Sequence, residues 1–181
     1  ISKRLKLAIA FSGMPAFTPN EVALALAYCA NQSEALQHLI LLASDFKAQI
    51  ELNFPGDDWS AQLFIATYSD ELRCGKLYLI STAPYGGLPA MELVDMDDAV
   101  TPGGDRSALM GRHVDLDDPE SFDIERDGID LLKAQRQFAW PNGYSAVGGF
   151  VELTRIGSDD ITKRILHRWP DKVGEQMPSV G

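Results

Sequence analysis

Residues 5–13 read LKLAIAFSG, and this stretch decides how the rest of the chain is interpreted. It is an apolar run of strand type that ends in a small polar residue and a glycine, Ser12 and Gly13. Glycine in such a place marks a sharp turn or a close approach of the backbone to another group. The sequence therefore predicts a strand at residues 5–13 that leads into a turn.

The composition indicates an ordinary soluble globular protein. The chain has 181 residues, of which 45% are hydrophobic and 23% charged, and its net charge is -10. Phosphate binding needs clustered Lys and Arg, so this charge argues against a nucleic-acid partner. No apolar run reaches the roughly 18 residues of a membrane span, and no signal peptide is recognisable. We expect a cytoplasmic protein with a single domain over residues 1–181.

Helix and strand signals alternate along the chain. The motif Thr18-Pro19-Asn20-Glu21 is a helix start, because Thr can cap and Pro fits the first helical position. The first element after it is a helical pair or one bent helix over residues 19–52, with the first helix running to about Asn31. The later predicted elements are a hairpin over 62–69 and 76–82, a short strand over 89–96, a helix over 121–137, and a final pair of strands over 146–156 and 160–169.

These elements predict an α+β fold. Hairpins separated by helices favour antiparallel sheets with helices on their outer faces. The first hairpin is apolar on both faces at its centre, which indicates a sheet covered on both sides. For the helix over 121–137 we expect an apolar stripe formed by Ile124, Gly128, Leu131, Leu132, Gln135 and Phe138.

The order of elements and three of the segments resemble an N-terminal-nucleophile (Ntn) hydrolase of the proteasome β-subunit type. Leu5–Gly13 resembles the third strand of that family, which precedes its first long helix. The hairpin of residues 64–70 and 76–81 resembles the strand pair that follows the two helices of the family. Thr101–Asp105 resembles the Gly-rich turn near the active site. The resemblance spans roughly residues 3–170 and implies a four-layer αββα sandwich of two antiparallel sheets.

The resemblance also implies an activity. These enzymes hydrolyse amide or peptide bonds with an N-terminal Thr, Ser or Cys, whose own α-amino group acts as the base. It implies a homo-oligomeric ring or stacked assembly, a peptide substrate, and no metal or cofactor. The first candidate site is an oxyanion or substrate turn at Ala10, Phe11, Ser12 and Gly13. The second is a turn near the site at Pro102, Gly103, Gly104 and Asp105. Each has the alternative of a turn without a ligand.

The sequence departs from the family pattern in two places. The printed chain starts with Ile1, whereas the nucleophile of the family and its supporting Asp and Lys lie before the strand that Leu5–Gly13 resembles. Pro102 stands where the family often has Ser. We expect the nucleophile upstream of residue 1, because an unpaired apolar strand at residues 5–13 would be an exposed edge. The alternative is a divergent, inactive relative.

Three further groups of residues have both functional and structural interpretations. The acidic residues Asp115, Asp117, Asp118, Glu120 and Asp123 suit a hard cation or, more simply, a solvated loop before a helix N-terminus. His38, His113 and His167 lie too far apart in sequence to predict a metal site. The basic segment 163–170 suits an interface with an acidic partner surface, including another copy, or a strand end at which Trp169 closes the core.

Two other functions remain open from the sequence. One is a non-catalytic structural or assembly subunit built on the same kind of sandwich, because fold alone does not decide function. The other is a small-molecule-binding α+β domain with one deep apolar pocket. Cys29 and Cys74 show neither metal-binding nor disulfide spacing and are expected to be a buried thiol and a loop thiol.

Overall fold

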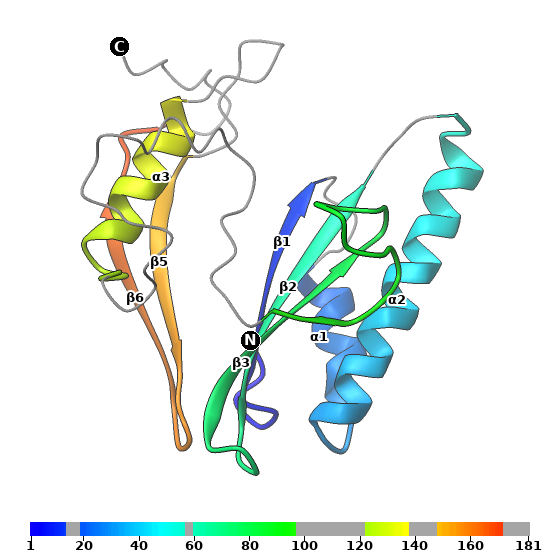
Figure 1. Ribbon diagram of the computed structural model, residues 1–181, viewed down its shortest axis with the longest axis horizontal. Coiled ribbons are helices and arrows are strands. Elements are labelled where there is room, and N and C mark those ends of the chain that lie inside the picture. The colour runs from blue at the N-terminus through cyan, green and yellow to red at the C-terminus, as the bar shows by residue number, and fades with distance from the viewer. Residues whose placement is uncertain (14–18, 57–59, 97–121, 138–147, 172–181) are drawn as a thin grey trace. The chain divides into compact units, whose positions relative to one another are not determined.

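A computed structural model describes residues 1–13, 19–56, 60–96, 122–137 and 148–171. In these residues the chain is an α+β protein with two antiparallel sheets and three helices (Figure 1). The chain divides into two compact units, Ile1–Asp97 with Ile156–Thr162, and Asp98–Arg155 with Lys163–Gly181. None of the described helices has both the length and the apolar character needed to cross a bilayer.

The first unit contains a four-stranded antiparallel sheet in the order β1–β2–β3–β4. The strands are β1 (Leu7–Gly13), β2 (Ala61–Ser69), β3 (Cys74–Ser81) and β4 (Val94–Asp95). The predicted strand 5–13 is confirmed from Leu7 onward, whereas Leu5 and Lys6 lie in a turn. The predicted hairpin is confirmed, with Cys74 and Gly75 in a strand rather than in the turn. Apolar β-branched and aromatic residues fill the centres of both hairpin strands, as suits a pleated surface.

A tight reversal of the chain precedes β1. The amide of Lys6 donates to the carbonyl of Lys3 at 3.2 Å, and Lys6 has a positive φ of 48°. Ser2 and Leu7 exchange two backbone hydrogen bonds, of 2.8 and 3.0 Å, as an antiparallel pair does. The Lys6 ammonium also lies 2.5 Å from a carboxylate oxygen of Asp70. Ser2 therefore runs beside Leu7 at the edge of β1 that faces away from β2.

Two helices cover one face of this sheet. They are α1 (Pro19–Ala27) and α2 (Gln32–Asn53), which confirms the predicted helical pair, although α1 ends about four residues before its expected end. Asn31 accounts for the early break, because its side chain caps α2 by accepting a 2.9 Å hydrogen bond from the amide of Glu34. The Glu34 carboxylate in turn accepts from the amide of Ala30 at 2.6 Å, a variant of the capping box.

The junction between the two helices is tied to the start of β1. The guanidinium of Arg4 donates to the carbonyl of Leu26 in the last turn of α1 at 3.3 Å and to that of Cys29, just after the helix, at 2.5 Å. A cation at this end complements the helix dipole. The Gln32 amide donates to the carbonyls of Leu5 at 2.8 Å and Tyr68 at 2.9 Å. These contacts join both helices to the first turn of the chain.

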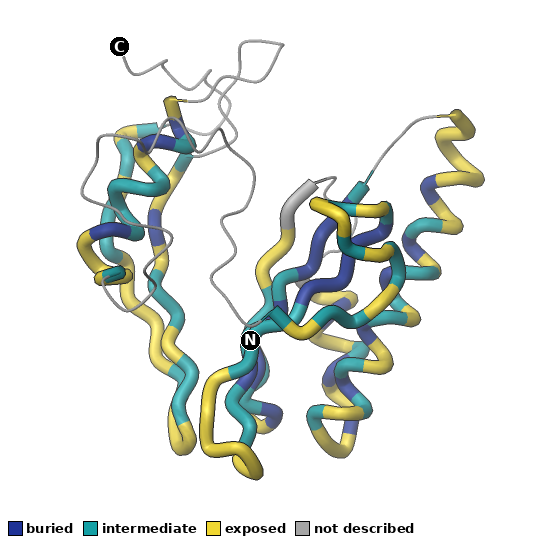
Figure 2. Tube along the Cα trace, viewed as in Figure 1, coloured by how far each residue is buried: buried dark blue, intermediate teal, exposed yellow. Residues whose placement is uncertain are grey.

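The core lies between the helices and the sheet. Buried positions, dark blue in Figure 2, line the facing sides of α1, α2 and the strands. The core cluster consists of Leu5, Leu7, Val22, Leu26, Cys29, Ala35, Leu39, Ala43, Phe46, Ile50, Ala61, Leu63, Ile65 and Ile80. In α2 the buried residues recur at helical spacing, while the side facing away from the sheet is exposed.

The opposite face of the sheet is also apolar. Side chains alternate along a strand, so the neighbours of the core residues face away from the helices. In register across three strands, these outward residues are Ala8, Ala66 and Leu77, then Ala10, Phe64 and Leu79. Leu79 is only 1% exposed. An apolar second face agrees with the prediction of a sheet that is buried on both sides.

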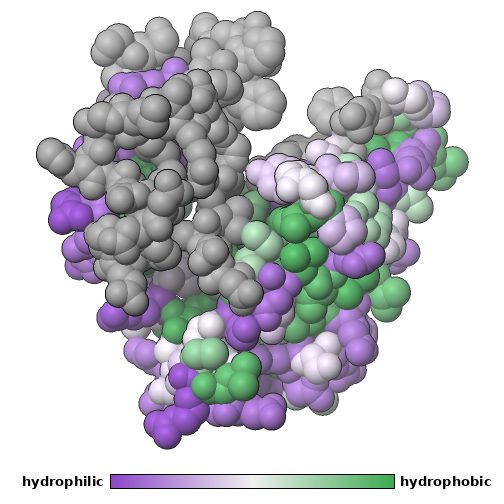
Figure 3. All heavy atoms as spheres, in the orientation of Figure 1, coloured by the Kyte–Doolittle hydropathy of each residue, from purple (hydrophilic) through white to green (hydrophobic). Residues whose placement is uncertain are grey.

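The segment after β3 is mostly irregular. The predicted strand over 89–96 is wrong in length, because only the two residues of β4 pair with β3. Met91 has a positive φ of 61°, which is incompatible with a continuous strand. Its side chain and that of Leu93 pack against the core cluster. Figure 3 shows hydrophobic residues gathered in this part of the first unit.

The second unit contributes α3 (Asp127–Gln137) and most of the hairpin of β5 (Phe150–Ile156) and β6 (Ile161–Arg168). The hairpin is confirmed, with a loop in which the amide of Gly157 donates to the carbonyl of Asp160 at 2.9 Å. β5 begins four residues later than predicted.

The predicted stripe of the third helix is wrong. The helix starts at Asp127 rather than Ser121, and its buried residues are Asp127, Ala134 and Arg136. Ile124 lies before the helix and is 56% exposed, and Phe138 falls outside the described residues. Asp127 and Arg136 are buried together with hydrogen-bond and ion-pair partners, which offset the cost of burying a charge. Apolar periodicity does not detect such positions.

Candidate functional site

The first candidate site forms part of a strand. Ala10, Phe11, Ser12 and Gly13 are the last four residues of β1, and they pair in continuous register with β2 from Phe64 back to Ala61. The predicted turn at these positions is therefore wrong in conformation. A residue held in a ladder on one side keeps its backbone extended, so any turn begins after Gly13, beyond the described part of this segment.

The register brings Ser12 into a polar row across three strands. Ser12 pairs with Gln62, and Gln62 pairs with Ser81. Gln62 is 8% exposed and Ser81 is 2% exposed. All three positions lie on the face of the sheet opposite the helices, because their neighbours Leu63 and Ile80 belong to the core. The end of this apolar second face is thus polar.

Partners within the protein satisfy part of this row. The Ser81 hydroxyl donates to the carbonyl of Ala83 at 2.6 Å, and the Gln62 amide donates to the Ser60 hydroxyl at 3.4 Å. Gln62 and Ser81 are therefore buried polar side chains with hydrogen-bond partners inside the chain. Sequence reasoning missed Gln62 and Ser81. Counting outward from the hairpin turn, where Ser69 pairs with Cys74, would have placed them opposite each other.

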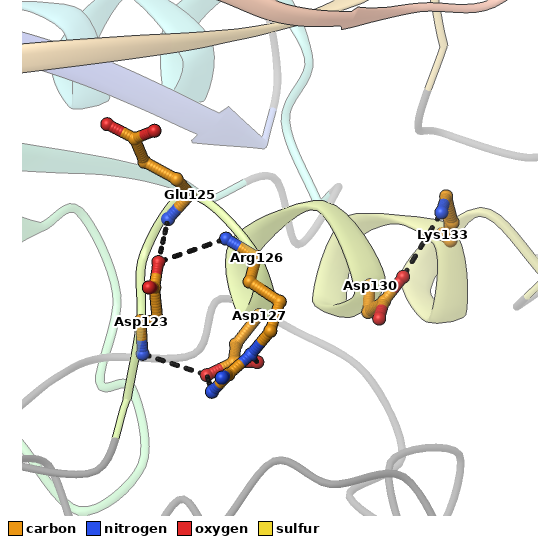
Figure 4. A network of polar contacts seen from close by, with 6 residues as sticks. All are labelled: Asp123, Glu125, Arg126, Asp127, Asp130 and Lys133. Carbon is orange, nitrogen blue, oxygen red and sulfur yellow. Dashed lines mark hydrogen bonds and ion pairs between the residues drawn. The ribbon is translucent and has the colours of Figure 1, made fainter.

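The second candidate turn, at Pro102, Gly103, Gly104 and Asp105, lies outside the described residues, as does most of the acidic loop. Of that loop, Asp123 is described and caps the turn before α3 (Figure 4). Its carboxylate accepts from the amides of Glu125 at 2.9 Å and Arg126 at 3.1 Å. The structural interpretation of Asp123 is therefore the better one.

The network continues into α3. The Asp127 carboxylate accepts from the amide of Asp123 at 2.8 Å and lies 2.5 Å from Nε of Arg126. The hydrogen bond between Arg126 and Asp127, together with the negative charge of Asp127, raises the pKa of Arg126 above its usual value. One turn further along, Lys133 pairs with Asp130 at 3.1 Å. Within the described residues, no group of His, Cys, Asp and Glu side chains is arranged to hold a metal ion.

The basic segment has acidic and aromatic partners in its own unit. Lys163 lies 2.5 Å from Glu152, and Arg164 pairs with Glu125. The guanidinium of Arg168 lies 5.3 Å from the centre of the Phe150 ring. Since each of these cations has an intramolecular partner, the predicted interface with an acidic surface gains no support from their geometry.

Trp169 packs against a buried ion pair formed by Arg136 and Asp171. The Arg136 guanidinium lies 5.1 Å from the Trp169 ring and forms two hydrogen bonds with Asp171, one of 2.8 Å. The Asp171 carboxylate also accepts from the amide of Gly149 at 2.7 Å. The bonds from Arg136 and Gly149 lower the pKa of Asp171. Packing of Trp169 within the unit is thus its structural role, and the network was not predicted.

A half-open pocket of about 390 Å³ lies in the first unit between β1 and α1. Its lining is mixed, with Arg4 as its charged member and Ser2 as its hydroxyl among mostly apolar residues. The remaining lining residues are Ile1, Ile9, Phe11, Val22, Ala23, Leu26 and Ala27. Two of them, Ile9 and Phe11, come from the strand that decides the fold.

The histidines and cysteines supply no reactive site among the described residues. His38 is exposed on α2, and His167 packs edge-on against Trp169 with ring centres 5.0 Å apart. Burial raises the pKa of the Cys29 thiol, which favours the unreactive protonated form. Cys74 is exposed. A search of protein-family models and of curated proteins gives no match to this sequence.

Proposed function

We propose that this chain is the greater part of a proteasome-like Ntn-hydrolase domain that cleaves an amide or peptide bond, with its nucleophile upstream of residue 1. One observation carries the proposal. The antiparallel sheet β1–β4 has a helix pair on one face and an apolar opposite face. A sheet of this kind requires a further layer, and in an αββα sandwich that layer is a second antiparallel sheet.

The β5–β6 hairpin is our candidate for part of the second sheet. It follows α3 in the chain, as the closing strands of the sandwich follow the third helix in the order we expect. The polar row of Ser12, Gln62 and Ser81 at the end of the apolar face is our candidate for the substrate-binding end of the site. Both are proposals that rest on the order of elements and on the register of β1–β3.

The test is hydrolysis by the full polypeptide with its native N-terminus. Intact mass and N-terminal sequencing should find a mature Thr, Ser or Cys upstream of Ile1. A fluorogenic peptide amide should be cleaved, and an electrophilic peptide inhibitor should add one mass equivalent to that residue. Substituting the nucleophile by Ala should abolish both signals. A native N-terminus of another type, or an intact Thr, Ser or Cys with neither turnover nor adduct, would refute the enzymatic proposal.

A non-catalytic assembly subunit is the second candidate, and the outer side of α1 favours it. Leu24 in α1 is 61% exposed, and Tyr28, directly after the helix, is 80% exposed, so two large side chains of this segment face solvent. A homo-oligomer that buries this side should dissociate in the variant Leu24→Ser. Light scattering that shows the same mass for both proteins at all concentrations would remove this support.

A further inference from the structure

We propose that the pocket between β1 and α1 binds a small amphiphilic carboxylate, a molecule with one anionic head group and a short apolar tail. The pocket lies on the side of β1 that faces the helices, because Ile9 lines it and shares that side with the core residue Leu7. The polar row that contains Ser12 lies on the other face of the sheet. This binding site is therefore separate from the proposed hydrolase site.

The helix wall of the pocket is polar at one end and apolar at the other. The Arg4 guanidinium contacts the carbonyls of Leu26 and Ala27 in the last turn of α1, at 3.3 and 3.4 Å. Ala23 lies four residues before Ala27, which is about 6 Å along the helix axis. Ala23 lines the pocket together with its apolar neighbour Val22. A head group at Arg4 thus leaves room for a tail toward Ala23.

The strand wall has the same polarity. Ser2, which carries the hydroxyl of the lining, pairs with Leu7 at the start of β1. Ile9 lies two residues further along β1, a distance of about 7 Å. The hydroxyl therefore lies at the start of β1, in the same first turn of the chain as Arg4, and the apolar side chain lies beyond it.

Both polar side chains of the lining can donate a hydrogen bond to an anion. The Ser2 hydroxyl oxygen accepts from the amide of Leu5 at 3.3 Å, which leaves its O–H as a donor. A guanidinium has five N–H donors. In Arg4 the contacts within the described residues use Nη2 and, at 3.5 Å from the carbonyl of Ala30, Nη1, so Nε is left as a donor. A carboxylate accepts from such groups.

The charge at this end also favours an anion, although the whole protein has a net charge of -10. Lys3 precedes Arg4 in the first turn, is exposed and has no ion-pair partner within the described residues. A helix C-terminus carries about half a negative charge, which the full charges of Lys3 and Arg4 outweigh. Glu34, at the helix junction, is not a lining residue, and its carboxylate accepts from the amide of Ala30 at 2.6 Å.

The size of the pocket limits the ligand. Its volume of about 390 Å³ is near the lower end of the roughly 300–1,000 Å³ of small-molecule pockets. A single short chain suits this volume, whereas a diacyl lipid does not. Burial of each methylene of the chain should raise the affinity by up to about fourfold.

The test is isothermal titration calorimetry of the full polypeptide with octanoate as the probe. Octanoate should bind with a Kd below about 1 mM. Hexanoate, which lacks two methylenes, should bind about 3–15 times more weakly. Octanamide and octylammonium, which have the same chain but no negative charge, should bind at least about tenfold more weakly than octanoate. Binding of octanoate should weaken as the salt concentration rises.

Two variants locate the ligand. Ala23→Trp fills the apolar part of the pocket, and Arg4→Gln removes the charge at the other end; each should weaken octanoate at least about tenfold. Ala48→Trp on the exposed side of α2 and Arg73→Gln in the turn between β2 and β3 are the matched controls and should bind octanoate like the parent. Circular dichroism at 222 nm checks that each variant is folded. If Arg4→Gln is unfolded, the ligand series and Ala23→Trp decide the question.

Three results would overturn the proposal. They are no binding of octanoate at concentrations up to about 10 mM, equal affinities for octanoate and octanamide, and unchanged octanoate binding by Ala23→Trp. Calorimetry measures binding without turnover, so an inactive protein that binds octanoate in this pocket would contradict only the proposed hydrolase.

Discussion

Replacing Leu39 by Ala tests whether α2 is oriented on the sheet as described. Leu39 is fully buried in the core cluster, whereas Leu41, two residues along the same helix, is 62% exposed. The change Leu39→Ala removes three carbons from the core, which at about 0.8 kcal/mol per methylene costs about 2.4 kcal/mol in transfer free energy. The helical neighbours Ala35 and Ala43 are small and buried, so they cannot fill the space, and a cavity term adds to the cost.

We therefore expect Leu39→Ala to lower the free energy of unfolding by about 2–5 kcal/mol. For a protein of this size, this corresponds to a drop in Tm of about 4–20 °C. The variant Leu41→Ala is the matched control, with the same change in the same helix, and should stay within about 0.5 kcal/mol of the parent. Urea unfolding followed by circular dichroism at 222 nm measures both, because α2 is the longest described helix. An equal or larger loss for Leu41→Ala would refute the assigned orientation of α2.

Three further outcomes follow from the described contacts. Asn31→Ala should lower the free energy of unfolding by about 1 kcal/mol, because the amide of Glu34 loses its cap, and urea titration measures this. Asp171→Asn should lower Tm at pH 7. The folded pKa of Asp171 lies below its unfolded value of about 3.9, so the stabilisation is complete above that value and is lost as the pH falls through the folded pKa. The gap in Tm between parent and variant should therefore narrow below about pH 4, and a constant gap would contradict this reading. In the native protein a thiol reagent should label Cys74 and leave Cys29 unmodified until urea unfolds the chain; equal labelling of both thiols would be inconsistent with the burial of Cys29.

The sequence predicts the first unit well because its signals are local. Pro19 begins α1, and apolar residues at helical spacing define α2. The strands β2 and β3 are apolar runs separated by a polar turn, so their pairing depends on residues close in sequence. These elements required no knowledge of the rest of the chain.

The third helix and the strand after β3 show where this reasoning stops. Asp127 and Arg136 are buried because each has a specific polar partner. The partner of Arg136 is Asp171, 35 positions further along the chain, and the spacing of apolar residues does not reveal such a partner. Met91 likewise has a positive φ although its residue type does not favour one, and its side chain packs against the core cluster.

The candidate site was predicted only in part, because it also depends on contacts between residues that are distant in the sequence. The sequence indicated Ser12 and Gly13, but the conformation expected there was a turn, and the structure places both residues in β1. Their polar neighbours, Gln62 and Ser81, emerge from the pairing of three strands, and the β1–β2 part of that pairing joins residues about 50 positions apart. Register over such a separation is decided by packing of the whole sheet.

The ties between the first turn and the helix junction have a consequence for how the protein responds to proteolysis. Arg4 and Leu5 hold the C-terminal end of α1 and the start of α2 through hydrogen bonds to Cys29 and from Gln32. A protease that removes the residues up to Lys6 would cut neither helix. It would nevertheless remove the hydrogen bonds of Arg4 and Leu5 that stabilise the junction between α1 and α2. Arg4 and Leu5 thus stabilise a helix junction that lies more than 20 residues further along the chain.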